Sequence, residues 1–282
     1  MTTVILQLIC PDRPGLVSEL SSWIFDNRGN IRHADHHTDE GTNLFLSRLE
    51  WDLDGFQISR EKISVEIECL ANSLGGKAQL HFSDEMPNVA IFVSQQSHCL
   101  LDLLGRVSNN ELRMKVPLII SNHNYLKDLC SQFNAQYMYI PVHSESKIIS
   151  EKIILDLLAD FEIDLVVLAK YMQVLSSNFL NSFSNVINIH HSFLPAFKGA
   201  KPYHRAWERG VKLIGATAHY VTEDLDDGPI IDQAIAHVSH RDEVDDLIRK
   251  GRDIERIALA RALRFHLRRQ VMVYQGRTAI FA

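Results

Sequence analysis

The chain of 282 residues has few of the features that mark membrane-spanning and secreted proteins. No apolar run approaches the roughly 18 residues that a membrane span needs. The opening segment MTTVILQLIC lacks the basic region of a signal peptide. The four cysteines are far apart and form no CxxC pair, which disfavours a disulfide framework or a zinc site; they are Cys10, Cys69, Cys99 and Cys130. These absences predict a cytoplasmic protein without a membrane partner.

Positive charge and nucleotide-binding glycines are also scarce. Lys and Arg total 29 against 35 Asp and Glu, which gives a net charge of -6. Because phosphate binding needs concentrated Lys and Arg, this balance disfavours a nucleic acid partner and favours a small-molecule enzyme. Residues 94–105, which follow an apolar strand-like run, lack the GxGxxG that a dinucleotide-dependent oxidoreductase would need.

The first 82 residues combine strand and helix patterns. Two prolines and a glycine at residues 11–15 predict a turn. The apolar residues Leu16, Leu20 and Ile24 then share one helical face. The predicted strands span residues 4–10, 30–39, 43–52 and 77–82, and the predicted helices span residues 15–27 and 56–74. The order βαββαβ is that of a ferredoxin-like domain.

After a short polar linker, apolar runs of strand length alternate with helical stretches. The predicted strands span residues 89–93, 116–121, 137–140, 165–169, 186–189 and 216–221, and a long helix at 243–268 and a strand at 270–274 follow. This alternation predicts a Rossmann-like, mostly parallel α/β domain with helices on both faces of the sheet. Ligands bind such sheets beyond the carboxyl ends of the strands.

Two segments at predicted strand ends carry groups suited to acyl chemistry. Side chains alternate along a strand, so Asn188 and His190 point the same way. The aspartate-rich turn DLDDGP at residues 224–229 follows the strand 216–221. An amide can stabilise an oxyanion, a histidine can transfer protons, and an aspartate can orient the histidine and position a water. Each segment alone is also compatible with a structural role, as a hydrogen-bonded pair or a solvated acidic loop.

These segments resemble the folate-dependent formyltransferase family. The resemblance rests on NIHHSFLP at 188–195 with AFKGAKPY at 196–203, on LAKYMQVL at 168–175, and on TAHYV at 217–221 with LDDGPII at 225–231. It implies that Asn188, His190 and Asp226 are the catalytic trio. It also implies a pterin pocket formed partly by backbone groups, at Met172, Gln173, Val174, Leu175, Thr222 and Gly228.

The N-terminal part resembles an ACT domain, a module that senses amino acids and commonly pairs between subunits. CPDRPGLV at 10–17 and NRGNI at 27–31 carry this resemblance. It implies a homo-oligomer, either a dimer or a tetramer. It also implies an amino-acid effector, with glycine and methionine as candidates. The implied effector residues are Asp12, Gly15, Asn30 and Ile31.

An ACT domain in front of a formyltransferase domain is the layout of the formyltetrahydrofolate deformylases. HHSFLPAF at 190–197 and GRDIER at 251–256 also resemble that family. The implied parts are an ACT regulatory domain at 1–83, a linker at 84–87 and a catalytic domain at 88–282. The implied reaction is hydrolysis of 10-formyltetrahydrofolate to formate and tetrahydrofolate, which supplies formate for purine synthesis and balances the one-carbon pool. No metal and no cofactor besides the folate substrate are expected.

The loop after the first strand of the catalytic domain favours water as the formyl acceptor. A glycinamide ribonucleotide transformylase binds the phosphate of its acceptor with a glycine-containing loop at a helix N-terminus. Residues 94–99 read SQQSHC, without the glycine that would let the backbone wrap around an anion.

Three alternatives to this hypothesis are considered, and the role of one further histidine stays open. A methionyl-tRNA formyltransferase would share the catalytic motifs but would need a tRNA-binding domain and a basic surface. A non-catalytic amino-acid sensor would have no need of the trio. A metal site at His33, His36 and His37 would require side chains that do not share one strand face. His219 is either support for the site or a hydrogen-bonded strand histidine.

Overall fold

A computed structural model describes residues 2–195 and 202–282, so residues 196–201 of the AFKGAKPY segment lie outside the described part of the chain. The chain divides into two compact units. The first unit comprises residues 1–85, 268–272 and 279–282, and the second comprises residues 86–267 and 273–278. No helix in the described ranges is long and apolar enough to cross a membrane.

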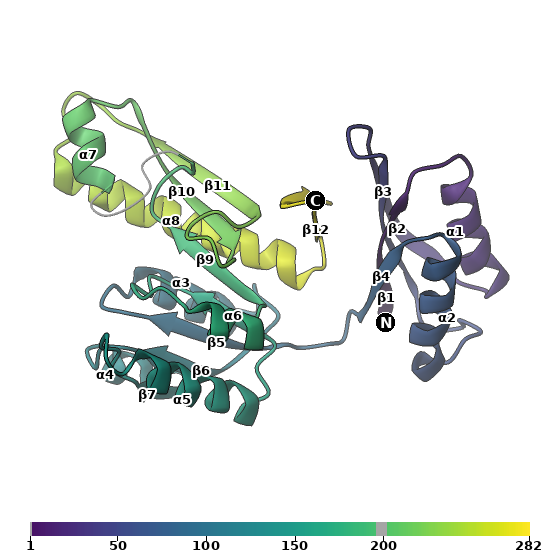
Figure 1. Ribbon diagram of the computed structural model, residues 1–282, viewed down its shortest axis with the longest axis horizontal. Helices are drawn as coiled ribbons and strands as arrows, with labels where there is room; N and C mark the ends of the chain where they lie inside the picture. Colours follow the sequence, from purple (N-terminus) through teal and green to yellow (C-terminus); the bar gives the residue numbers. More distant parts are fainter. Residues whose placement is uncertain (1, 196–201) are drawn as a thin grey trace. The chain divides into compact units, whose positions relative to one another are not determined.

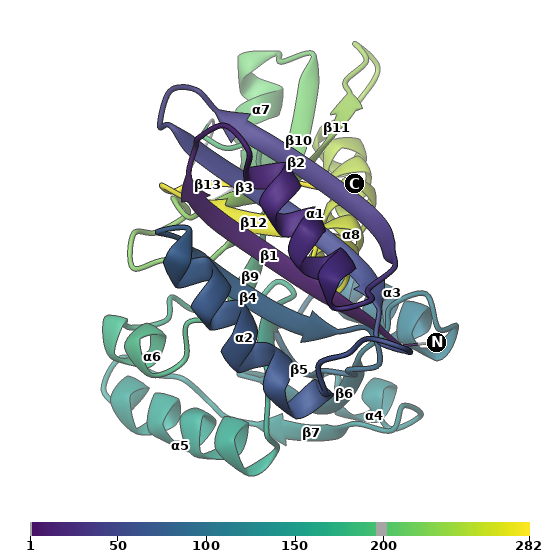
Figure 2. The same cartoon turned by 90° about the vertical axis from the view of Figure 1, so that its right-hand side faces the viewer.

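The first unit is a four-stranded antiparallel sheet with two helices. Its elements are β1 (Thr3–Pro11), α1 (Leu16–Asp26), β2 (Ile31–Asp39), β3 (Leu44–Asp52), α2 (Arg60–Ser73) and β4 (Lys77–Phe82). The strand order is β2-β3-β1-β4, and both helices cover the same face of the sheet (Figure 2). This architecture confirms the predicted ferredoxin-like plan.

Alternation along the strands explains how this unit buries its core. Leu6 and Leu8 of β1 and Trp51 of β3 face the helices and are fully buried. Helix α2 begins at Arg60, four residues later than the pattern predicted. Gly55 has a φ of 79°, in the left-handed region that glycine tolerates, and the resulting turn delays the helix.

The opposite face of this sheet contacts the end of the chain. The side-chain amide of Gln7 donates hydrogen bonds to the carbonyls of Arg269 and Val271. The guanidinium of Arg48 donates to the carbonyl of Arg269 as well. The chain ends in a two-stranded sheet, β12 (Val271–Tyr274) and β13 (Arg277–Ile280), of which only β12 was predicted.

The second unit is built on a seven-stranded sheet of order β11-β10-β9-β8-β5-β6-β7 (Figure 1). Its elements are β5 (Asn88–Val93), α3 (His98–Ser108), β6 (Lys115–Ser121), α4 (Lys127–Cys130), β7 (Gln136–Tyr139), α5 (Lys147–Asp160), β8 (Leu165–Leu168), α6 (Ser177–Ser182), β9 (Val186–His190), α7 (Pro202–Arg209), β10 (Leu213–Tyr220), β11 (Ile230–His237) and α8 (Val244–Leu267). The five strands from β9 to β7 run parallel, and β10 and β11 are antiparallel to their neighbours. The mostly parallel sheet confirms the predicted class, but β11 was not predicted.

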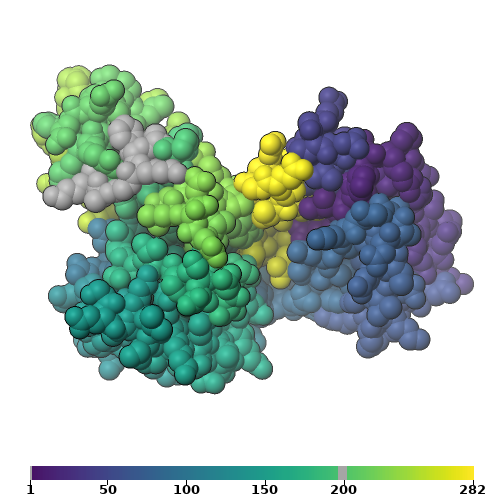
Figure 3. All heavy atoms as spheres, in the orientation of Figure 1, coloured from purple at the N-terminus to yellow at the C-terminus, as the bar shows by residue number. Residues whose placement is uncertain are grey.

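Parallel pairing of the central strands places their carboxyl ends at one edge of the sheet. Every residue of β8 is buried, and α5 and α6 pack on one face through Ile154, Leu158 and Phe179. In the space-filling view the teal first half of this unit and its green second half adjoin (Figure 3). Chain segments from both halves therefore reach the edge where β5, β8 and β9 end.

Candidate active site

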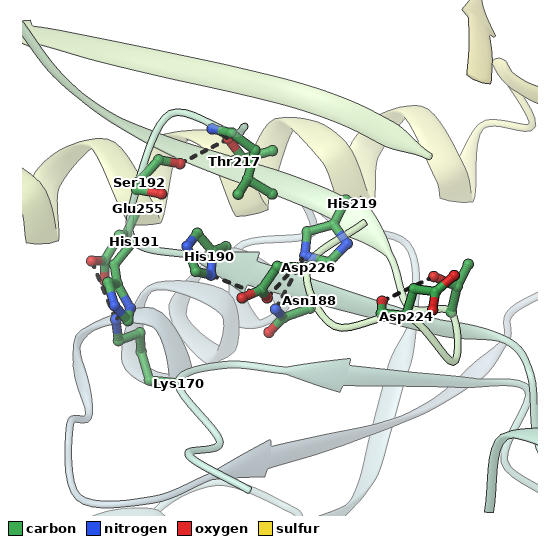
Figure 4. A network of polar contacts seen from close by, with 12 residues as sticks. Lys170, Asn188, His190, His191, Ser192, Thr217, His219, Asp224, Asp226 and Glu255 are labelled. Atoms are coloured by element: carbon green, nitrogen blue, oxygen red, sulfur yellow. Dashed lines mark hydrogen bonds and ion pairs between the residues drawn. The ribbon is translucent and has the colours of Figure 1, made fainter. Parts of the chain in front are cut away.

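The end of β9 carries the two side chains that the sequence singled out. Asn188 and His190 are two residues apart and line the same pocket, which has a volume of about 260 Å³. His190 is 6% exposed. Figure 4 shows both side chains pointing toward Asp226. The alternation of the strand therefore brings the amide and the imidazole together, as predicted.

The aspartate arrives by a route that differs from the sequence prediction. Because β10 runs antiparallel to β9, with Tyr220 opposite Ile187, the end of β10 lies at the opposite edge of the sheet from His190. The loop after β10 is closed by a hydrogen bond from the amide of Tyr220 to the carbonyl of Pro229. It folds back along β9, and Asp226, at a φ of 55°, reaches His190.

The contact between His190 and Asp226 indicates which ring nitrogen of His190 carries the proton. Nδ1 of His190 lies 3.1 Å from Oδ1 of Asp226, so Nδ1 is the ring nitrogen that donates to the carboxylate. Nε2 of His190 is buried and has no hydrogen-bond partner among the described residues. Burial opposes ionisation of Asp226, but the hydrogen bond from His190 and the charge of the nearby histidines lower its pKa overall. The carboxylate is therefore ionised near neutral pH.

His219 holds the amide of Asn188. Nδ1 of His219 lies 2.8 Å from the carbonyl of Tyr220, so Nδ1 carries the proton. Nε2 then accepts from Nδ2 of Asn188 at 3.2 Å. Burial lowers the pKa of His219 and favours this neutral form. One amide hydrogen of Asn188 is thereby fixed, and the other is free to face the pocket. His219 therefore contacts Asn188 through Nε2 and the backbone of its own strand through Nδ1.

The walls of the pocket include most of the residues implied for the pterin. Met172, Gln173, Val174, Leu175 and Thr222 all line it. Gly228 does not. A Cβ at Gly228 would stand 1.8 Å from the carbonyl oxygen of Tyr220, so the glycine allows the loop to close against β10. Gly228 therefore permits the conformation of the loop and does not line the pocket.

A second group of buried charges lies beside the trio and was not singled out from the sequence. Nζ of Lys170, which follows β8, lies 3.0 Å from Nδ1 of His191 and 3.3 Å from Oε1 of Glu255 in α8. Glu255 also accepts from Nε2 of His98 and from the hydroxyl of Tyr203, each at 2.7 Å. The signal in the sequence was Glu255 on the buried face of a helix. Buried charges are rare unless paired, so this glutamate indicated a cationic partner.

The protonation states of this group follow from its partners. Burial opposes ionisation of Glu255, yet the hydrogen bond from His98 and the charge of Lys170 lower its pKa to about 2. Burial, together with the charge of Lys170, lowers the pKa of His191 to about 4. The ring of His191 stacks on that of His190 with centroids 4.9 Å apart. A neutral imidazole therefore lies against the ring of the trio.

A second pocket, of about 400 Å³, shares a wall with the first. Lys170, Met172 and His191 line both pockets. Ser94, Gln95 and Gln96, from the loop without glycine, line only the second.

One group in the described ranges has the spacing of metal ligands. It consists of His98, Cys99 and Glu255, whose ligand atoms lie within 4.8 Å of one another. The ammonium of Lys170 already serves as the cation beside Glu255, and burial raises the pKa of the Cys99 thiol. These residues are a poor fit for a metal ion. His33, His36 and His37 form no such group; Nδ1 of His36 lies 3.1 Å from the hydroxyl of Ser47.

The four implied effector residues form two groups within one chain. Asp12 and Gly15 lie in the turn before α1, and Asn30 and Ile31 follow it. Since α1 has 11 residues, about 16 Å of helix separates the groups. The side chain of Asn30 donates to Asp52 at 3.0 Å.

Comparisons with known proteins agree with these two units. A family model described as formyl transferase matches residues 87–263, and an ACT domain model matches residues 4–64. The formyltetrahydrofolate deformylase of Synechocystis sp. is 55% identical over 280 residues, which cover 99% of each chain. The crystal structure of the deformylase from Pseudomonas syringae pv. tomato superimposes with a TM-score of 0.97 at 40% identity, covering 100% of this chain and 95% of that one.

The transformylases resemble a smaller part of the molecule. The structure of glycinamide ribonucleotide transformylase 1 from Symbiobacterium toebii has a TM-score of 0.67 and 28% identity, and the match covers 72% of this chain and 98% of that one. The fold and the matches thus define a formyltransferase domain preceded by an ACT domain. The chain belongs to the formyltetrahydrofolate deformylase family.

Proposed function

We propose that this chain hydrolyses 10-formyltetrahydrofolate to formate and tetrahydrofolate, with Asn188, His190 and Asp226 as the catalytic residues. The relatives above are named for the deformylation of formyltetrahydrofolate. The observation that carries the assignment of residues is the buried Nε2 of His190, which has no hydrogen-bond partner among the described residues and belongs to a ring whose Nδ1 donates to Asp226. The ring lines the same pocket as Asn188.

We propose that the pterin binds in the pocket of about 260 Å³. The segment from Met172 to Leu175 forms one wall, and the loop from Thr222 to Asp226 forms another. Bound there, the folate would present its formyl group to the end of β9. His190 and Asn188 would then lie on either side of the reacting carbon.

Attack by water needs a base and a partner for the developing oxyanion. Nε2 of His190 takes a proton from the water as the water oxygen bonds to the formyl carbon. Asp226 compensates the charge of the imidazolium through the 3.1 Å contact at Nδ1. The free amide hydrogen of Asn188 donates to the oxyanion, while His219 fixes the orientation of that amide.

Collapse of the tetrahedral intermediate completes the reaction. The bond between the formyl carbon and N10 breaks, and the imidazolium of His190 returns its proton to N10. Formate and tetrahydrofolate leave, and the imidazole is neutral again. Water supplies one oxygen and two protons, of which one ends on N10 and the other passes to the solvent as formic acid ionises to formate, so the step balances without a further reactant. Formate released in this way is available for purine synthesis.

For the ACT domain we propose an amino-acid effector, with glycine and methionine as candidates, and pairing with a second copy of the chain. Asp12 and Gly15 are the proposed effector contacts within one chain, because Asn30 and Ile31 lie beyond the other end of α1. Calorimetric titration of the wild type and of Asp12→Ala with each amino acid tests the effector, and light scattering tests the pairing. The four free cysteines support a reducing, cytoplasmic compartment.

The experiment for the reaction uses the purified chain with 10-formyltetrahydrofolate and no acceptor. Equal amounts of formate and tetrahydrofolate should appear, and His190→Ala should abolish both. Transfer only after glycinamide ribonucleotide is added would identify a transferase instead. No reaction in either assay, with an amino acid still bound, would identify a sensor.

A further inference from the structure

The wall between the two pockets contains a lysine in an unfavourable backbone conformation. Lys170 has a φ of 66°, in the left-handed region where a side chain is disfavoured. Its neighbours hold it there: its carbonyl accepts from the amide of Ser94 at 3.1 Å. The backbone amide of Met172, two residues further along the chain, donates to the hydroxyl of Ser94 at 2.9 Å.

The side chain of Lys170 is buried as well as strained. The residue is 7% exposed, and its ammonium contacts His191 and Glu255 inside the protein (Figure 4). A buried ammonium carries a desolvation penalty that its partners must offset. A strained backbone and a buried charge at one residue, beside a catalytic histidine, are features that cluster at functional sites.

An organic formyl acceptor bound in the second pocket would lie close to the ammonium of Lys170. Such an acceptor attacks through an amine, and the amine needs acceptors for its N–H groups as it approaches the formyl carbon. Two hydrogen-bond acceptors in the lining of the second pocket are the carboxylate of Glu255 and Nδ1 of His191. Lys170 already donates to both. Its positive charge also repels a protonated amine, whereas water is neutral and small.

We propose that Lys170 determines the choice of formyl acceptor, because its ammonium occupies the position and the hydrogen-bond partners that the amine of an organic acceptor would need. This inference rests on the proposed function, since it explains why water is the acceptor in that reaction. The second pocket is then an acceptor-side pocket that Lys170 closes toward His190. The ammonium of Lys170 takes the place of a substrate amine, and this exclusion makes the site specific for water.

Removal of the ammonium should let a small amine compete with water. In the transfer step the amine nitrogen bonds to the formyl carbon, the bond from that carbon to N10 breaks, and the proton lost by the amine passes to N10. The products are an N-formyl amide and tetrahydrofolate, with no oxidant or reductant required. Lys170→Gly both opens the space and relieves the left-handed backbone.

The test measures the ratio of N-formylglycinamide to formate when 10-formyltetrahydrofolate is supplied with excess glycinamide. In Lys170→Gly the ratio should rise about tenfold or more over the wild type, corrected for the reaction without enzyme. Lys170→Met, which fills the space without the charge, should give a smaller rise. Lys170→Arg, which keeps a cation, should match the wild type. A merely structural role would lower both products together and leave the ratio unchanged.

The outcomes separate this inference from the proposed function. Formate from the wild type tests the hydrolysis itself, and its absence would overturn the proposed function. Wild-type ratios in both Lys170→Gly and Lys170→Met, with formate still released, would overturn only the role of Lys170. If Lys170→Gly does not fold, the comparison of Lys170→Met with Lys170→Arg decides, and equal ratios in those two variants would contradict the proposal.

Discussion

Two adjacent histidines at the end of β9 have environments of opposite charge. His190 donates to the carboxylate of Asp226, while His191 lies against the ammonium of Lys170. The rings are stacked with an interplanar angle of 16°. We propose that His190 is the base, because Asp226 can compensate the charge of its imidazolium. Burial and, after it, the ammonium of Lys170 lower the pKa of His191 and keep that ring neutral. Because their surroundings differ, we propose different roles for these two neighbouring residues of the same type.

The largest expected effect breaks this comparison directly. His190→Ala should lower kcat for formate release about a thousandfold or more, because both proton transfers pass through this ring. His191→Ala, the matched control, should lower kcat by about tenfold or less, because it removes only a packing surface and a partner of Lys170. Formate is measured at saturating folate, and circular dichroism checks that both variants fold. Equal losses in the two variants would mean that the roles are wrongly divided.

The next effect concerns the oxyanion donor and the residue that holds it. Asn188→Ala should lower kcat about a hundredfold or more, which corresponds to roughly 3 kcal/mol in the barrier. His219→Phe keeps a ring but removes the acceptor for Nδ2 of Asn188, and should lower kcat by about tenfold. Both variants should unfold near the wild-type temperature. Near-normal turnover in Asn188→Ala would refute its role.

A third prediction addresses the stability of the Lys170 side of the site. Glu255→Gln leaves the buried ammonium of Lys170 without its carboxylate, and should lower the free energy of unfolding by about 3 kcal/mol near neutral pH. Asp253→Asn, on the same helix and with a side chain 54% exposed, should change it by less than about 1 kcal/mol. Urea unfolding of the two variants measures the difference.

The pH dependence of that difference has a fixed sign. The pKa of Glu255 is about 2 in the folded protein against an ordinary value of 4.5. A lowered pKa stabilises the folded state fully above the ordinary value, and the contribution is lost as pH falls through the folded value. The gap between wild type and Glu255→Gln should therefore be constant above about pH 5 and shrink from there toward pH 2. A gap that widens on acidification would contradict the assignment.

The smallest expected effect is that of a chelator. Formate release should be unchanged after treatment with a strong chelator, because Glu255 of the His98, Cys99 and Glu255 group is already hydrogen-bonded to Lys170, His98 and Tyr203. Loss of activity that a divalent metal restores would show that this group takes part in the reaction as a metal site.

Periodicity predicted the elements that bury a continuous apolar face. β1, β3, β4 and β5 to β9 fall close to their predicted positions, because their apolar residues are contiguous or alternate. The mostly exposed β2 was located by the turn signals on either side of it. β11 was missed because only Ile231 and Ala234 of its eight residues are buried, too few to give a pattern.

Local patterns predicted that some side chains of the pocket lie together, but not how the pocket is assembled. Asn188 and His190 share a side by strand alternation alone. The approach of Asp226 depends on the antiparallel pairing of β10 and the return of its loop, which no local pattern encodes. The contact of Lys170 with Glu255 joins residues 85 positions apart, so only the tertiary fold shows that they meet.

The central claim, direct attack by water at the formyl carbon, is tested most directly by a single turnover in water enriched in oxygen-18. Enzyme in excess over 10-formyltetrahydrofolate is quenched, and the formate is analysed by mass spectrometry. Direct attack predicts that the formate of this first turnover carries one labelled oxygen. Unlabelled formate would show that its new oxygen came from the protein, as it would if the carboxylate of Asp226 attacked first and water then opened the mixed anhydride at the aspartyl carbon, and would contradict the account.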